Sequence, residues 1–89
     1  MSFVKDPAAE LDYTVDWTKW LAGDTISTSS WTIPSGLTKG TKGESNTTKT
    51  ATIWLKGGTL GTEYTVTNKI VTTAGRTDER SFTITIEDR

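Results

Sequence analysis

The chain has 89 residues, a formal net charge of −1 and 33% hydrophobic residues, and it contains neither cysteine nor histidine. This length allows one domain with a thin core, and the missing residue types exclude disulfides, thiolate or histidine catalysis and the usual zinc sites. The near-neutral charge gives no bulk attraction to nucleic acid or to an anionic membrane. We therefore expect no cofactor, no metal, and neither a nucleic-acid nor a membrane partner.

Residues 1–9 are expected to form an extended, poorly packed lead-in, because the Asp-Pro pair at residues 6–7 disfavours helix. Within this lead-in, Phe3 and Val4 are candidates for contact with a sheet edge or a neighbouring protein. The segment has no apolar stretch typical of a signal peptide, so export by that route is not expected. Residues 10–89 are predicted to form a single domain.

Apolar residues alternate with polar ones over residues 11–17, which predicts a first strand. The spacing of Trp17, Trp20 and Leu21 then fits one helical turn near residues 17–22, with Asp16 as its N-cap. This turn is expected to close one end of the core with two indoles. An exposed aromatic platform for a sugar or a protein partner is the alternative, but the small number of apolar residues elsewhere favours the core.

Residues 25–33 are rich in threonine and serine and predict a strand whose alternation changes phase. Both ends of this strand can face inward only if a bulge or a break lies near Ser29 and Ser30. Trp31 is then a candidate for the buried tryptophan of a β-sandwich.

Residues 39–46 contain no apolar residue, and their glycines predict a mobile surface loop in which Lys39 and Lys42 could contact a protein. The next strand, residues 50–56, alternates so that Trp54 faces away from the core. Two interpretations of Trp54 remain open. It is either an ordinary exposed aromatic residue or a contact for a carbohydrate or a protein.

The final third predicts a hairpin, with a first strand from about residue 63, a break at residues 74–79 and a return strand at residues 81–87. Tyr64 is placed as in a tyrosine corner, and Phe82 lies on the apolar face of the return strand. Asn68 interrupts the apolar face of the first strand, so either a bulge shifts the register or the amide finds partners near the sheet end. The whole pattern predicts an all-β fold, an immunoglobulin-like antiparallel β-sandwich of about seven short strands.

Several short motifs resemble those of small virion proteins of tailed bacteriophages and prophages, a group described as fiber-tail adaptor or tail-associated proteins. The motifs that carry the resemblance are Leu11-Asp12-Tyr13, Asp16-Trp17, Trp20-Leu21, Gly61-Thr62-Glu63-Tyr64 and Ala74-Gly75-Arg76-Thr77. The resemblance extends from about residue 6 to residue 87. It implies an immunoglobulin-like structural module in the phage particle, and it transfers no catalytic or binding residue.

The leading hypothesis is therefore a non-catalytic structural adaptor of a phage virion, which links or decorates tail, fiber or capsid proteins, in multiple copies per particle. It would be made in the cytoplasm of the host bacterium and located in the virion. The alternative is a small carbohydrate-binding module that uses Trp54 together with Trp17 or Trp20. An enzyme is not expected, because the acidic residues suggest no cleft between two carboxylates.

Overall fold

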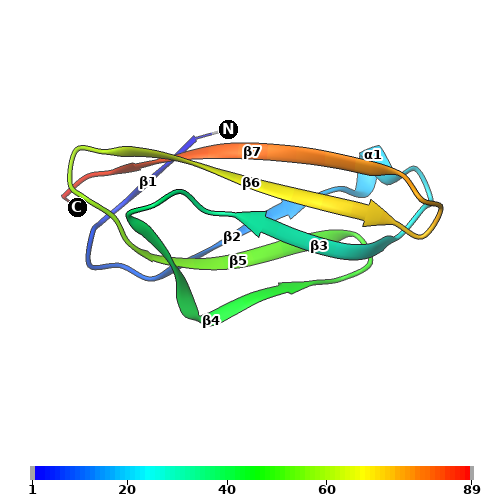
Figure 1. Ribbon diagram of the computed structural model, residues 1–89, viewed down its shortest axis with the longest axis horizontal. Coiled ribbons are helices and arrows are strands. Elements are labelled where there is room, and N and C mark those ends of the chain that lie inside the picture. The colour runs from blue at the N-terminus through cyan, green and yellow to red at the C-terminus, as the bar shows by residue number, and fades with distance from the viewer. Residues whose placement is uncertain (1, 89) are drawn as a thin grey trace.

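The computed structural model describes residues 2–88, and within them the chain forms seven strands and one short helix (Figure 1). In chain order the elements are β1 (Ser2–Lys5), β2 (Leu11–Asp16), α1 (Thr18–Leu21), β3 (Ile26–Thr32), β4 (Leu37–Asn46), β5 (Thr50–Gly57), β6 (Glu63–Thr72) and β7 (Thr77–Ile86). One sheet has the strand order β1-β7-β6-β3, and the other has the order β2-β5-β4. The expected all-β architecture of two layers is confirmed.

The strand order can be compared with that of the immunoglobulin sandwich, whose seven strands are lettered A to G. With the same lettering in chain order, β2, β5 and β4 correspond to the B, E and D strands, and β3, β6 and β7 correspond to C, F and G. The first strand differs, because β1 pairs in parallel with β7 instead of joining the sheet of β2. Six of the seven strands therefore follow the immunoglobulin order.

The core lies between the two sheets and follows the period-two alternation of the strands. Its buried side chains include Ile53 and Leu55 from β5 and Ile84 and Ile86 from β7, each 0% exposed. Burial of such a side chain stabilises the fold by about 1.5–3 kcal/mol.

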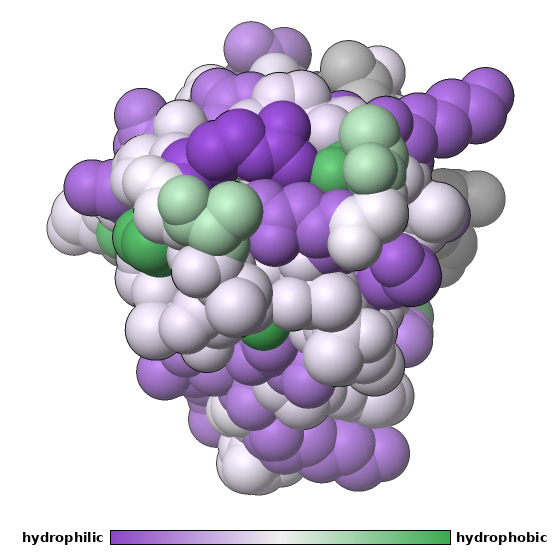
Figure 2. Space-filling model, turned by 90° about the vertical axis from the view of Figure 1, so that its right-hand side faces the viewer, coloured by the Kyte–Doolittle hydropathy of each residue, from purple (hydrophilic) through white to green (hydrophobic). Residues whose placement is uncertain are grey.

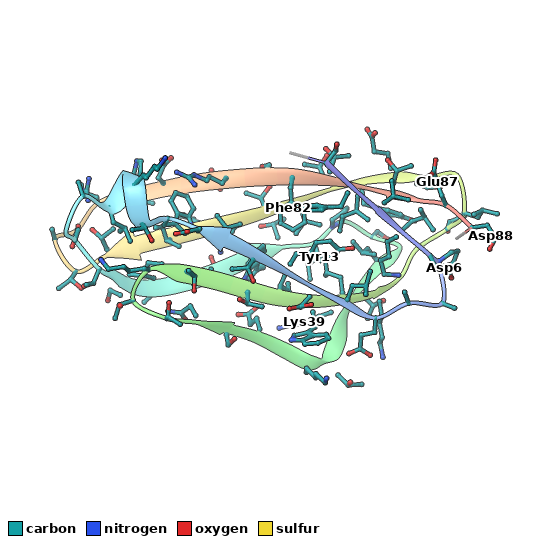
Figure 3. The ribbon with its side chains drawn as sticks, turned by 180° about the vertical axis from the view of Figure 1, so that it is seen from behind. Asp6, Tyr13, Lys39, Phe82, Glu87 and Asp88 are labelled. Atoms are coloured by element: carbon teal, nitrogen blue, oxygen red, sulfur yellow. The ribbon has the colours of Figure 1, made fainter. Side chains whose placement is uncertain are left out.

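Phe82 packs in an aromatic group inside the core, where its ring lies 5.5 Å from the ring of Tyr13 (Figure 3). The ring of Trp31 lies 6.0 Å from that of Phe82. Phe82 is buried and Trp31 is half-buried, so both belong to the packed interior. Within residues 2–88, two buried side-chain polar atoms have no partner, and both belong to this group: Oη of Tyr13 and Nε1 of Trp31.

Asn68 lies at the centre of a buried polar network between the sheets. Its Oδ1 accepts a hydrogen bond from Nε1 of Trp17 at 2.9 Å, and its Nδ2 donates to Oγ of Ser29 at 2.9 Å and to the carbonyl of Ser30 at 3.0 Å. The pairing of β6 with β7 continues through Asn68 without a register shift. The amide is therefore satisfied by partners, and no bulge is needed at this position.

Tyr64 is buried at the start of β6, and its Oη accepts a hydrogen bond from the backbone N–H of Thr59 at 3.0 Å. This is the bond that a tyrosine corner predicts. The ring leaves little room beside it, because a Cβ at Gly36 would lie 2.9 Å from Oη. Gly36 also has a φ of +100°, so the turn into β4 requires glycine for two reasons.

The expectation of a poorly packed lead-in at residues 1–9 is wrong for β1, which extends the four-stranded sheet. Phe3 packs on the core, with its ring 5.0 Å from that of Tyr13, and Lys5 is 0% exposed. The Lys5 ammonium donates to the carbonyls of Asp6 at 2.9 Å and Gly57 at 2.8 Å. Phe3 and Lys5 both face inward. Because a lysine is rarely buried, the sequence pattern did not indicate an inward face for this strand.

The expected mobile loop at residues 39–46 is also wrong, because these residues belong to β4, which pairs with β5. β4 is an edge strand, and most of its side chains are exposed. Such a strand needs few apolar residues, so its composition resembles that of a loop. Its glycines lie in a four-residue bulge at residues 40–43.

Three other boundaries differ from the sequence-based expectations. The register shift in β3 falls between Ile26 and Thr28, and not near Ser29 and Ser30, so the later part of the strand is regular. The helical turn is shorter than residues 17–22, because Trp17 is the N-cap and Ala22 the C-cap. β7 begins before residue 81, since its pairing with β6 continues almost to the turn.

Candidate interaction surface

Trp54 lies on the outer face of the three-stranded sheet, as the alternation of β5 predicts, and its side chain is half-buried. On one side it is paired with Asp12 of β2. On its other side, β4 pairs through Lys39 with Leu55 and then through Glu44 with Ile53. Residues 40–43 therefore form a four-residue bulge opposite Trp54.

Glu10 holds this bulge in place from the far side of β5. Its Oε2 accepts hydrogen bonds from the backbone N–H of Thr41 at 2.9 Å and from Oγ1 of Thr41 at 3.0 Å. A Cβ at Gly40 would lie 2.5 Å from the same carboxylate oxygen, so a larger residue there would displace the Glu10 carboxylate from its present position. Gly43 has a φ of +68° and lets the chain return to the ladder.

The bulge places Lys42 over Trp54, with Nζ 4.2 Å from the ring centroid. A cation–π contact at such an exposed site contributes about 0.5–1 kcal/mol. Lys39 lies on the same edge strand (Figure 3), where its ammonium forms an ion pair with Glu44 at 3.5 Å. The bulge and β5 together present an indole and one ammonium group, those of Trp54 and Lys42, and we call this the Trp54 face.

The pair Trp17 and Trp20 does not form an exposed platform. Trp17 is 0% exposed, and its ring lies 5.4 Å from that of the half-buried Trp20. The guanidinium of Arg80 lies 4.4 Å from the Trp17 ring, and that of Arg76 lies 4.5 Å from the Trp20 ring. The core interpretation is therefore confirmed for Trp17, and the aromatic platform is wrong.

The acidic residues at this end of the molecule have structural partners. Oδ1 of Asp16 accepts from the backbone N–H of Thr18 at 2.9 Å and from its hydroxyl at 2.6 Å, so Asp16 supports the start of α1, although Trp17 is the N-cap. Asp24 forms an ion pair with Arg76 at 3.2 Å. Hydrogen bonds, chiefly from the side chain of Thr18, lower the pKa of Asp16, and those led by Thr72 lower the pKa of Asp24.

This end of the sandwich, which carries α1 and the β6–β7 turn, is viewed face-on in Figure 2. Hydrophilic and near-neutral side chains cover most of it, and the hydrophobic spots are small and separate. Arg76 closes the end by donating from Nη2 to the carbonyl of Leu21 at 2.7 Å. We infer that this end is built to seal the core.

The opposite end carries the three exposed large hydrophobic side chains among residues 2–88, namely Val4, Leu11 and Leu60. Val4 precedes Lys5, whose ammonium reaches the end of β5, and Leu11 pairs with Leu55 near that same end. Leu60 lies in the β5–β6 loop and is 59% exposed. We call this the β5–β6 end.

The structure separates the five residues that the sequence suggested for protein contact. Lys42 lies over Trp54, and Lys39 is on the same edge strand but pairs with the inward-facing Leu55. Val4 lies on the other sheet with 38% exposure. Phe3 faces the core and is not available to a partner without unpacking. Sequence reasoning missed Leu11 and Leu60, because the first fits the strand alternation and the second lies among turn residues.

Within residues 2–88 no three metal-binding side chains gather, and no pocket is found. In the same range, no helix has both the length and the apolar character needed to cross a lipid bilayer.

Comparison with known proteins gives one finding about the family. A search of curated proteins finds no match to the chain. Residues 5–85 match the model of a family described as podophage GP4 fiber-tail adaptor protein gp77. This range includes β2 to β6 and nearly all of β7, so it covers both sheets. The chain therefore belongs to the podophage GP4 fiber-tail adaptor family.

Proposed function

We propose that this protein is a non-catalytic adaptor of a phage virion that joins a fiber protein to the tail, in multiple copies per particle. The observation that carries the proposal is the family match over residues 5–85. In this proposal the protein is made in the host cytoplasm and acts only in the assembled virion.

The arrangement of the polar side chains supports a structural role. Asp16 and Asp24 are engaged by the backbone and by Arg76, and Glu10 holds the β4 bulge. Hydrolysis by a carboxylate pair needs two free carboxyl groups that face each other across a substrate. These carboxylates instead connect elements of the fold.

Two surfaces are proposed to contact the partners. The Trp54 face combines a half-buried aromatic ring with the Lys42 ammonium, a combination that suits a protein contact because aromatic side chains often carry binding energy. The β5–β6 end offers exposed Leu60 and Val4, whereas the opposite end is mainly hydrophilic. An adaptor needs two different surfaces, and we assign this role to the Trp54 face and the β5–β6 end.

The experiment compares particles of the phage that encodes this chain with particles of a deletion mutant. We expect mass spectrometry to find the protein in purified wild-type particles, and electron microscopy to show deletion particles that keep their tails but lack fibers. Deletion particles with a full set of fibers would contradict the proposal.

Substitutions at the two surfaces then test which contacts are used. Leu60→Asp and Trp54→Ala are expected to lower fiber occupancy while both purified variants remain folded, because neither side chain is deeply buried. Ala74→Asp in the exposed β6–β7 turn is the matched control at the opposite end. Equal fiber loss in the control would show that the effect is not specific to these surfaces.

A further inference from the structure

β3 forms a free edge of the four-stranded sheet (Figure 1). Apart from a bulge near its start, it lacks the features that usually protect such an edge. Natural sheets protect their edges with charged side chains, proline, bulges or very short strands. The other free edges have such features: β4 has its bulge and lysines, β2 has Asp12 and Asp16, and β1 has only four residues. β3 has seven residues without any charge, proline or glycine.

The regular part of β3 is open to a further strand. The bulge of this strand lies between Ile26 and Thr28, so residues 28–32 pair with β6 in continuous register. The N–H of Ile26 donates to the carbonyl of Thr48, which covers the start of the strand. Within residues 2–88, no turn or loop backbone group pairs with residues 28–32. Alternate residues of this segment therefore direct their backbone groups away from β6.

The outer-face side chains of this segment are symmetric about Ser30. Thr28, Ser30 and Thr32 are exposed on the outer face, while Ser29 and Trp31 face the inner side and are half-buried. In an antiparallel pair centred on Ser30, each outer hydroxyl meets another hydroxyl: Ser30 meets Ser30 of the second copy, and Thr28 meets Thr32. On the inner side, Ser29 meets Trp31.

We propose that two copies of this chain pair antiparallel through β3, with Ser30 at the two-fold axis, to form one continuous eight-stranded sheet. The fold already uses hydroxyl pairs of this kind between its own strands. Thr14 and Thr52 are 2.9 Å apart across β2 and β5, and Thr67 and Ser81 are 2.8 Å apart across β6 and β7. Such cross-strand pairs stabilise a sheet.

The occupant is a second copy because the edge is complementary to itself. An isologous two-fold contact requires one patch to match its own rotated image, and the outer sequence of threonine, serine and threonine does so. No like charges meet in the segment, since β3 has none. This pairing joins two copies of the chain and does not depend on the proposed link between fiber and tail. It can therefore be tested on the purified chain alone.

The first experiment measures self-association by sedimentation equilibrium from roughly 10 µM to roughly 1 mM, because a short edge contact is weak. We expect the average mass to rise from the monomer value of 9.7 kDa toward twice that value. Ser30→Lys places two ammonium groups opposite each other, and it should raise the dissociation constant at least about tenfold. Thr65→Lys is the control, because Thr65 is exposed on the same outer face of an internal strand.

The second experiment tests the register by cross-linking and uses the absence of cysteine from the chain. Ser30→Cys should form a disulfide-linked dimer on mild oxidation, and Thr65→Cys should not. A mixture of Thr28→Cys and Thr32→Cys chains should cross-link faster than either variant alone, because these positions meet only across the two copies.

Three outcomes would overturn the pairing. The first is a wild-type chain that stays at the monomer mass over the whole range. The second is a dimer that Ser30→Lys leaves as strong as before. The third is a Thr28→Cys chain that cross-links with itself as fast as the mixture does. If Ser30→Lys fails to fold, as judged by circular dichroism, the average mass of the wild-type chain and the cross-linking of the cysteine variants still test the pairing.

Discussion

The substitution Asn68→Ala should destabilise the fold far more than the removal of a surface amide. Asn68 is 0% exposed and makes three hydrogen bonds. The largest cost comes from the indole N–H of Trp17, which would remain buried without an acceptor, at about 1–3 kcal/mol. The partners on β3 lie nearer to solvent and can be hydrated. The small cavity adds to the loss, so we expect about 3 kcal/mol in total.

For a domain of this size, a loss of about 3 kcal/mol corresponds to a fall of about 12–24 °C in the unfolding midpoint. Thermal and urea unfolding, followed by tryptophan fluorescence, measure both quantities. A loss below about 1 kcal/mol would refute the reasoning, because the Trp17 N–H would then have found another partner or would not need one.

A double-mutant cycle isolates the bond to Trp17. Trp17→Phe removes the donor and keeps an aromatic ring, so Asn68→Ala should cost less in that background than in the wild type. We expect a coupling free energy of at least about 1 kcal/mol. Strictly additive effects would mean that the network does not couple the two sheets.

Three further predictions concern the Tyr64 corner, the loss of stability at low pH and the contribution of β1. Tyr64→Phe removes the bond from Thr59 and should cost about 1 kcal/mol in urea unfolding, and an unchanged midpoint would contradict the corner. The pKa of Asp24 is lowered in the folded state, chiefly by the side chain of Thr72. The ionised carboxylate therefore stabilises the fold at neutral pH, and this contribution is lost as pH falls through the folded pKa. Asp24→Asn should have a flatter stability profile below about pH 4, and a profile parallel to the wild type would contradict this assignment. Deletion of residues 2–9 should lower the thermal midpoint by several degrees, because β1 packs on the core. A truncated chain with the wild-type midpoint would show that β1 contributes nothing.

The β6–β7 hairpin is the clearest case in which local sequence was sufficient. Its alternation and its glycine turn predicted the pairing, and the position of Tyr64 predicted the hydrogen bond to a nearby backbone group. The same holds for the outward position of Trp54. In each case the determining pattern lies within a few residues, because side chains alternate along a strand with period two.

The sequence alone determined that the chain makes two layers of short strands, because the period of its apolar residues specifies strands wherever one face is buried. Other features depend on contacts with distant segments, and only the tertiary structure shows them. Lys5 is accepted in the core because the carbonyl of Gly57 lies beside it, and Asn68 because Trp17 and Ser30 do. β4 is a strand because it pairs with β5, and Glu10 holds its bulge from across that strand. These hydrogen-bonded partners are separated along the chain by 31 to 52 residues, and no local pattern records them.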